Sequence, residues 1–490
     1  MKYFESILAI LFFVSSIIFS QTGVFENYFL DQTMRIDYYH IGNANTEIVT
    51  IDQIYQYGIW SGSTLNLIDD FNNGAYYYKI YDSATGKLIF SRGFDSYFKE
   101  YQTGDDAANG VKRTYHESAI IPFPKNKIKF VLEKRDKQNK LNQVFTSVID
   151  PTDLYIIKDV VKDSEVKVYR SYYSGNPHKK VDVAILGDGY SKNDKKKFEK
   201  DLKRYTELFF SLEPYKSNRD KFNIYGIFKA SEESGIDEPG ANIYKSTTLG
   251  TRFYSLGSER YVLTEDNKVT RDLAAHVPYD AIYIMCNSAR YGGGGIYNFY
   301  CTFSADNQFS PYIFLHEFGH SFGGLADEYY TSDVAYNEFY PAGLEPVEPN
   351  ITRLLDKNNL KWKSAVTNGI EIPTLWEKDN YDKMDLNWQK ERRELNKKIA
   401  ELKRNRAAQK DIDALQNEYN VKDKLHSDEV DKYLLASKYW NKVGAFEGAG
   451  YSSKGMYRSM LDCIMFSKGT KPFCKVCEEH INKVIKHFSE

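Results

Sequence analysis

The chain has 490 residues, which is too long for one hydrophobic core and predicts two or more domains. Hydrophobic residues make up 42% and charged residues 27%, the usual balance of a soluble globular protein. The net charge of −2 gives no reason to expect nucleic acid or an anionic membrane as a partner. The 40 Tyr and 30 Phe residues favour a chain rich in β-strands, where aromatic side chains fit half-buried positions.

The N-terminus has the pattern of an export signal. Lys2 supplies a positive charge, residues 7–19 form an apolar run too short to span a bilayer, and a polar residue follows Ser20. A buried first strand or a membrane anchor would also be apolar, but the position and length favour a cleavable signal peptide over residues 1–20. No cysteine precedes Cys286, so a lipid-modified N-terminal cysteine is not expected. We therefore expect a protein without a membrane anchor that is secreted, periplasmic or at the cell surface. We also expect it to be a monomer.

Residues 21–152 are predicted to form an antiparallel β-sandwich. Short aromatic runs such as MRIDYYHI, GAYYYKIYD and KIKFVLEK alternate with Asn, Asp, Gly and Pro, a spacing typical of sandwiches. His40 and His116 lie within strand-like runs, where a lone His is more often structural than a ligand. Pro151 and the charged residues after it indicate a linker, so the second domain is expected over residues 165–490.

The second domain opens with the alternating strand and helix signals of an α/β fold. Residues 181–186 read as a strand, and Ser191 with Asp194 reads as a helix cap after the turn. The turn lacks the Gly-Lys-Ser/Thr of a phosphate-binding loop. Four consecutive glycines, which allow close approach of another backbone, follow further strand signals. They are Gly292, Gly293, Gly294 and Gly295. We read them as an edge strand for an extended substrate or, equally, as a flexible loop.

The sequence H-E-x-x-H at residues 316–320 predicts a metal-binding helix. His316 and His320 are four residues apart and so project from one face of a helix, where two imidazoles can bind one Zn²⁺. Gly323 and Gly324 can end this helix and turn the chain back toward the metal. The carboxylates at positions 327 and 328 come next, and either one is placed to supply a third ligand.

A charged stretch at about residues 387–420 predicts a helical insertion. Apolar residues recur in it at spacings of three and four, namely Leu395, Ile399, Leu402, Ile412, Leu415 and Tyr419. Two short amphipathic helices fit this pattern best, and we expect them to form a hairpin with a structural rather than a functional role. A partner-binding coiled coil would need more unbroken heptads.

The C-terminal region holds a candidate Met-turn and three of the five cysteines. In zinc endopeptidases of the metzincin type, a Met in a tight turn lies beneath the zinc-binding histidines; Met465 is the first candidate and Met460 the second. Cys474 and Cys477 would need further ligands to hold a second metal, so a disulfide or a buried thiol is the preferred interpretation. No pattern supports a structural Ca²⁺ ion.

The whole chain resembles the M64 family of secreted peptidases, the group named after immunoglobulin A peptidase. The likeness rests on DYYH, SRGF, ILGDGYS, NSARYGGGGIYN, HEFGHSFGGLADEY and the terminal YRS, CIMF and FCKVC. It implies a metzincin-like zinc peptidase domain of α/β (α+β) type after the sandwich. The longer metzincin motif would place the third ligand at Ala326, but the spacing associated with this family places it at Asp327, with Glu328 as the alternative.

The predicted function is hydrolysis of peptide bonds in proteins, with host or mucosal glycoproteins as candidate substrates. Three protein ligands leave a zinc position for a water molecule, and Glu317 would act as general base toward it. Tyr451 or Tyr457 is a candidate for stabilising the oxyanion. The alternatives are an inactive peptidase-fold binding protein or adhesin, and hydrolysis of a non-peptide substrate.

Overall fold

The computed structural model describes residues 24–158, 163–331, 340–341 and 343–490. The predicted signal peptide, residues 1–20, lies outside this range. No helix in the described part of the chain has the length and apolar character needed to cross a membrane.

The N-terminal part consists of two antiparallel sheets that share one hydrophobic core. The first has the strand order β2-β1-β5 and the second the order β4-β3-β6-β7. Their bounds are β1 Phe29–Gly42, β2 Glu47–Tyr57, β3 Tyr76–Asp82, β4 Leu88–Phe94, β5 Arg113–Pro124, β6 Ile128–Arg135 and β7 Leu141–Ile149. Three short helices accompany them, α1 Val24–Tyr28, α2 Tyr97–Gln102 and α3 Asp105–Ala108. Ile36 of β1, Ile80 of β3 and Phe130 of β6 are all fully buried in the shared core, which explains the alternating aromatic pattern.

The second part is built on a six-stranded mixed sheet with the order β12-β13-β11-β9-β10-β8. The four inner strands are parallel, and β8 and β12 are antiparallel strands at the two edges. The bounds are β8 Lys167–Tyr172, β9 Val181–Asp188, β10 Phe222–Phe228, β11 Ala281–Cys286, β12 Gly293–Ile296 and β13 Tyr300–Ser304. The expected α/β domain is therefore present.

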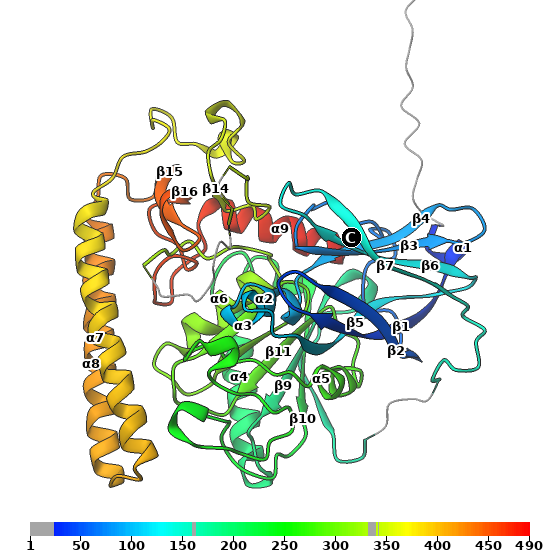
Figure 1. The fold of residues 1–490 in the computed structure, drawn as a ribbon, viewed down its shortest axis with the longest axis horizontal. Coiled ribbons are helices and arrows are strands. Elements are labelled where there is room, and N and C mark those ends of the chain that lie inside the picture. Colours follow the sequence, from blue (N-terminus) through cyan, green and yellow to red (C-terminus); the bar gives the residue numbers. More distant parts are fainter. Residues whose placement is uncertain (1–23, 159–162, 332–339, 342) are drawn as a thin grey trace, which may run out of the picture.

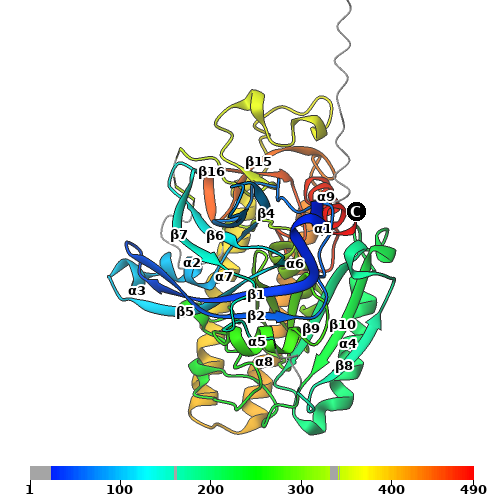
Figure 2. The ribbon, with the colours of Figure 1, turned by 90° about the vertical axis from the view of Figure 1, so that its right-hand side faces the viewer.

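Helices cover both faces of this sheet. On one face α4 (Lys195–Phe209) and α6 (Ser310–Ser321) pack on alternate residues of β9, including Val183 and Ile185. On the other face α5 (Asn267–Ala274) packs on the intervening residues, Ala184 and Leu186. Strands β1, β2 and β5 lie across α5 (Figure 2), where Asn267 of α5 donates to Ser118 of β5 at 2.9 Å. The N-terminal sheets are thus joined directly to the α/β part.

The C-terminal region adds a small sheet, a helical hairpin and a final helix. The sheet has the order β14-β16-β15, with β14 Ile351–Thr352, β15 Val443–Ala449 and β16 Ser452–Met460. The final helix α9, Lys475–Ser489, reaches the N-terminal sheets (Figure 1), where Asn66 donates to the carbonyl of His487 at 2.9 Å. Short 3₁₀ helices occur at Pro177–Lys179, Lys192–Asp194, Arg219–Lys221, Pro239–Ala241, Ser255–Gly257, Lys357–Asn359 and Lys363–Ala365.

The charged insertion is longer than predicted. It forms α7 (Lys378–Arg404) and α8 (Gln409–Leu435), each 27 residues long, rather than two short helices over residues 387–420. The two helices project together from one side of the molecule (Figure 1) and bury Trp388, Leu395, Ile399 and Tyr419 between them. Outside this seam few apolar residues recur at helical spacing. The predicted helices, which were based on that spacing, were therefore shorter than the real ones.

Candidate active site

Helix α6 carries the two histidines and ends where its glycines predict. It begins with a proline in its first turn, and apolar side chains surround it on several sides, because it packs on β12, β13 and the C-terminal segment. Gly324 has φ +58°, and its N–H donates to the carbonyl of His320 at 2.9 Å. The N–H of Leu325 donates to the carbonyl of Gly319 at 3.1 Å. This left-handed helix end turns the chain back along α6.

The turn brings three potential ligand atoms together. The Nε2 atoms of His316 and His320 are 3.2 Å apart, and each lies 3.1 Å from Oδ1 of Asp327. The other ring nitrogen of each histidine faces a backbone carbonyl, Ile464 at 2.9 Å for His316 and Leu325 at 2.6 Å for His320. These carbonyls fix the rings so that both Nε2 lone pairs point to a common centre. Zn–N and Zn–O bonds of about 2.0–2.2 Å give ligand separations of about 3.3–3.5 Å in a tetrahedron, so the three residues fit a metal ion.

The electrostatics of this group also favour a cation. Burial opposes protonation of His320, but Asp327 raises the pKa of His320 to about 9. Burial likewise opposes ionisation of Asp327, yet the two histidines hold its pKa well below the ordinary value. The negative charge of Asp327, which favours a proton on His320, would equally favour a metal cation in place of that proton.

Glu328 does not belong to this group. Its side chain is fully buried on the other side of the segment, where Oε1 accepts from Asn350 Nδ2 at 3.1 Å and lies 3.4 Å from the sulfur of Cys477. Of the two carboxylates that the sequence left open as third ligand, the structure brings Asp327, and not Glu328, to the histidines.

Glu317 faces the cavity beside the two histidines and lies against β12. Burial raises its pKa, although positive charge on His316 and His320 opposes this rise. A Cβ atom on Gly293 would lie 3.2 Å from Cγ of Glu317, so the side chain rests directly on the glycine strand. A carboxylate in this position can exchange a proton with a molecule bound in front of the histidines.

Three of the four glycines, Gly293–Gly295, lie in strand β12 rather than in a flexible loop, and Gly292 directly precedes the strand. A Cβ at Gly295 would lie 2.5 Å from the carbonyl oxygen of Glu317, which explains why only glycine fits against α6. β12 is the last strand of the sheet, as the substrate-edge interpretation requires. It is partly covered, however, because Gly293 donates to the carbonyl of Arg260 at 3.2 Å and accepts from the N–H of Val262 at 3.1 Å. An added strand must therefore bind beyond this point.

The C-terminal loop supplies the predicted methionine. Met465 is fully buried, and a Cβ on Gly319 of α6 would lie 2.7 Å from its sulfur, so Met465 lies directly against the helix. Its carbonyl accepts from the N–H of Glu328 at 2.8 Å. Met460, the second candidate, instead lies 3.5 Å from the N–H of Lys475 at the start of α9.

Only one of the two candidate tyrosines reaches the site. Tyr451 donates a short hydrogen bond to Oδ2 of Asp327. It stands in the tight turn between β15 and β16 with φ +62°, an uncommon conformation for a non-glycine residue, next to Gly450 with φ +52°. The turn also donates from its two N–H groups to the carbonyls of Asp327 and Tyr329, at 3.0 and 3.1 Å. The other candidate, Tyr457, lies in β16 beside Glu447 and is not among the described residues that line the cavity.

The site opens into a cavity of about 210 Å³ whose walls come from four regions of the chain. The N-terminal sheets contribute Asn73 and Asp95, the α/β part contributes Arg260, and the C-terminal loop contributes Lys468. Helices α7 and α8 of the insertion add seven residues, namely Tyr381, Asp385, Trp388, Gln389, His426, Ser427 and Val430. The α7–α8 hairpin therefore forms part of the cavity wall, in addition to any structural role. Sequence reasoning missed these residues, because nothing in their local sequence marks them and they meet only in the fold.

Comparison with known families agrees with this geometry. A sequence model described as IgA Peptidase M64 matches residues 171–485, and one described as Peptidase M64 N-terminus matches residues 24–146. The chain belongs to the IgA peptidase M64 family. Among curated proteins, the search finds no match. Membership confirms the resemblance seen in the sequence and makes the protein a peptidase, a hydrolase of a family of metallopeptidases. His316, Glu317, His320 and Asp327 all lie within the matched catalytic region of this M64 peptidase.

Proposed function

We propose that this M64 peptidase is a zinc-dependent endopeptidase that is exported and cleaves protein or peptide substrates. The observation that carries the proposal is the convergence of His316, His320 and Asp327 on one point, with the Glu317 carboxylate beside it in a cavity. Three protein ligands with one position left open are typical of catalytic zinc sites. A metzincin-like arrangement is supported by Met465 against the zinc-binding helix.

The zinc ion, when bound, supplies Lewis acidity toward a water molecule and the carbonyl of the scissile bond. The Glu317 carboxylate accepts a proton from the water and then donates it to the leaving amine. The backbone carbonyls of Ile464 and Leu325 keep the two histidine rings oriented throughout. The hydroxyl of Tyr451 holds the Asp327 carboxylate, which makes Tyr451 a positioning residue in this arrangement.

The shape of the site supports an extended segment of polypeptide as substrate. β12 ends the sheet next to Glu317, so a substrate strand can pair with its outer edge beyond Gly293. Two positively charged side chains, those of Arg260 and Lys468, line the cavity. Export is supported by the charged and apolar pattern of residues 1–20. The two N-terminal sheets with their shared core support the β-sandwich interpretation.

The substitution Glu317→Gln tests the proposal. It keeps the size of the side chain but removes the base, so zinc content should be unchanged while cleavage of a peptide library falls by about 10²–10⁴-fold. Glu348→Gln is the matched control, because Glu348 lines the same cavity but accepts from Tyr340 instead of facing the histidines. Cleavage retained by Glu317→Gln would reject the role of Glu317. If wild-type protein cleaves no peptide in a chelator-sensitive way, the alternative of an inactive binding protein is favoured.

A further inference from the structure

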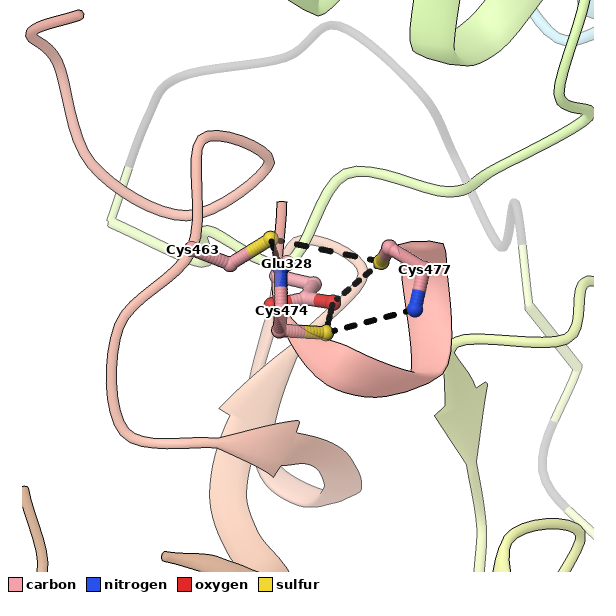
Figure 3. A group of neighbouring side chains, drawn as sticks. All are labelled: Glu328, Cys463, Cys474 and Cys477. Atoms are coloured by element: carbon pink, nitrogen blue, oxygen red, sulfur yellow. Dashed lines mark hydrogen bonds between the residues drawn. The ribbon is translucent and has the colours of Figure 1, made fainter. Parts of the chain in front are cut away.

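A second cluster of potential metal ligands lies behind the active site. It consists of Glu328, Cys463, Cys474 and Cys477, all buried, and we call it the cysteine cluster (Figure 3). Glu328 comes from the segment after α6, Cys463 from the loop after β16, and the two other cysteines from the start of α9. Sequence reasoning favoured a disulfide or a buried thiol here. All five cysteines of the chain are buried and free of disulfides, which agrees with the buried-thiol alternative, and the cluster also includes a carboxylate.

The distances in the cluster match a tetrahedral metal site. Sγ of Cys477 lies 4.0 Å from Sγ of Cys463 and 3.4 Å from Oε1 of Glu328, which in turn lies 3.8 Å from Sγ of Cys474. All four ligand atoms lie within 4.8 Å of one another. Zn–S bonds of about 2.3 Å and Zn–O bonds of about 2.1 Å give tetrahedron edges of about 3.5–3.8 Å. A disulfide would instead bring two sulfurs to about 2.05 Å and leave the third apart.

Hydrogen-bond donors face two of the three sulfurs, those of Cys463 and Cys474. The N–H of Cys474 points to Sγ of Cys463 at 3.1 Å, and the N–H of Cys477 points to Sγ of Cys474 at 3.5 Å. The Ser459 hydroxyl lies 3.1 Å from Sγ of Cys474. The spacing Cys-x-x-Cys at a helix start combines two ligands with the positive end of the helix dipole, a common zinc-binding arrangement.

Glu328 provides an independent sign of a missing partner. It is fully buried, and its Oε2 atom has no hydrogen-bond partner among the described residues. The nearby guanidinium of Arg458 interacts with it electrostatically but donates to the carbonyls of Gly448 and Leu461. Burying a carboxylate oxygen without a partner is unfavourable, and it is more so when the carboxylate is charged. A cation among the three sulfurs would bind Oε1, the oxygen that faces them, and would balance the charge of this buried carboxylate.

We propose that Glu328, Cys463, Cys474 and Cys477 bind a structural Zn²⁺ ion that is separate from the catalytic centre. Four protein ligands close the coordination shell, and none of the four is among the described residues that line the active-site cavity, so the ion has no position for substrate. Cys463 precedes Ile464, whose carbonyl orients His316, and Glu328 follows Asp327. The ion thus fastens α9 to the two segments that complete the active site.

The metal content of the full-length protein tests this inference independently of peptidase activity. Wild-type protein purified without chelator should contain about two zinc ions per chain, and His316→Ala/His320→Ala about one. Adding Cys474→Ser/Cys477→Ser to that variant should remove the remaining ion, whereas Cys286→Ser/Cys301→Ser, at buried cysteines outside the cluster, should not. Cobalt substituted for zinc in the histidine variant should show a thiolate-to-cobalt charge-transfer absorption.

The opposite results are equally clear. A folded histidine variant without zinc and without the cobalt absorption would reject the site, as would an intact mass lower by two hydrogens that a reductant restores, because that marks a disulfide. If the cysteine variants fail to fold, Glu328→Gln in the histidine variant replaces them, since it keeps the side-chain shape and should weaken zinc retention against a chelator by about tenfold or more. Unchanged retention would overturn the role of Glu328.

Discussion

The hydrogen bond between Tyr451 and Asp327 makes a quantitative prediction about metal affinity. The substitution Tyr451→Phe removes one hydroxyl and leaves the ring, so the Oδ2 atom of Asp327 loses the donor that holds it. Asp327 is buried, with 6% of its surface exposed, and water therefore cannot fully replace this donor. The carboxylate becomes both less well oriented and incompletely hydrogen-bonded.

The expected loss follows from the type of bond. A hydrogen bond to a buried charged group contributes about 1.5–3 kcal/mol, which corresponds to about 10-fold to 150-fold in zinc affinity. Removing a residue that orients a metal ligand typically lowers metal affinity by a similar factor. We therefore expect Tyr451→Phe to bind zinc 10-fold to 150-fold more weakly and to recover most of its kcat when zinc is saturating.

Zinc affinity measured by competition with a chelator, and kcat measured at saturating zinc, separate the two possible roles of Tyr451. A residue that stabilises the oxyanion would lower kcat by about 10²–10³-fold without changing zinc affinity. Tyr457→Phe on the same hairpin is the control and should change neither quantity, because Tyr457 does not line the cavity. Wild-type zinc affinity in Tyr451→Phe would refute the positioning role.

Two further substitutions and one pH series test other parts of the structure. Gly295→Ala places a Cβ 2.5 Å from the carbonyl oxygen of Glu317, so we expect a loss of about 1–3 kcal/mol in stability by urea unfolding and a clear loss of cleavage. Gly104→Ala, whose nearest contact would be 3.4 Å, should change neither, and equal behaviour of the two variants would contradict the packing argument. Burial opposes protonation of His40, yet the carboxylates of Glu117 and Glu47 raise the pKa of His40 from 6.5 to about 9. The charged pair therefore stabilises the fold fully below pH 6.5, and about 3 kcal/mol of that stability is lost as the pH rises through 9. Urea unfolding below pH 6.5 and above pH 9 should show this loss of stability in wild type and not in His40→Gln. The same pH dependence in both proteins would reject the stabilising role of charged His40.

The sequence predicted the parts of the site that are local along the chain. Spacing along one helix is enough to place His316 and His320 on a common face, and the following glycines correctly marked the helix end. The Met465 prediction depended on the family pattern, because the contact with Gly319 joins residues far apart in sequence. The residues alone left Asp327 and Glu328 open, and only the spacing associated with the family favoured Asp327, because the choice depends on which way each side chain turns in an irregular segment.

What the sequence predicted wrongly or did not indicate depends on contacts that only the fold creates. The α7 and α8 helices extend beyond their apolar seam, and their ends gain stability from the large hydrophobic core, in which Tyr381 and Leu434 are buried. Cys463 lies too far from Cys474 and Cys477 to be grouped with them by spacing alone, and a glutamate adjacent to a candidate ligand gave no sign of serving another cluster. In each case the missing information was tertiary contact, which local periodicity does not contain.

Asp327 and Glu328 are adjacent residues whose side chains belong to two different clusters, and this adjacency has a thermodynamic consequence. A shift of the shared backbone that improves one set of ligand distances also changes the other set. If an ion behind the active site raises the affinity of the front site for its metal by some factor, the front metal must raise the affinity of the rear site by the same factor. The two metal sites would therefore be filled and emptied cooperatively, and a chelator strong enough to remove one ion would also weaken retention of the other.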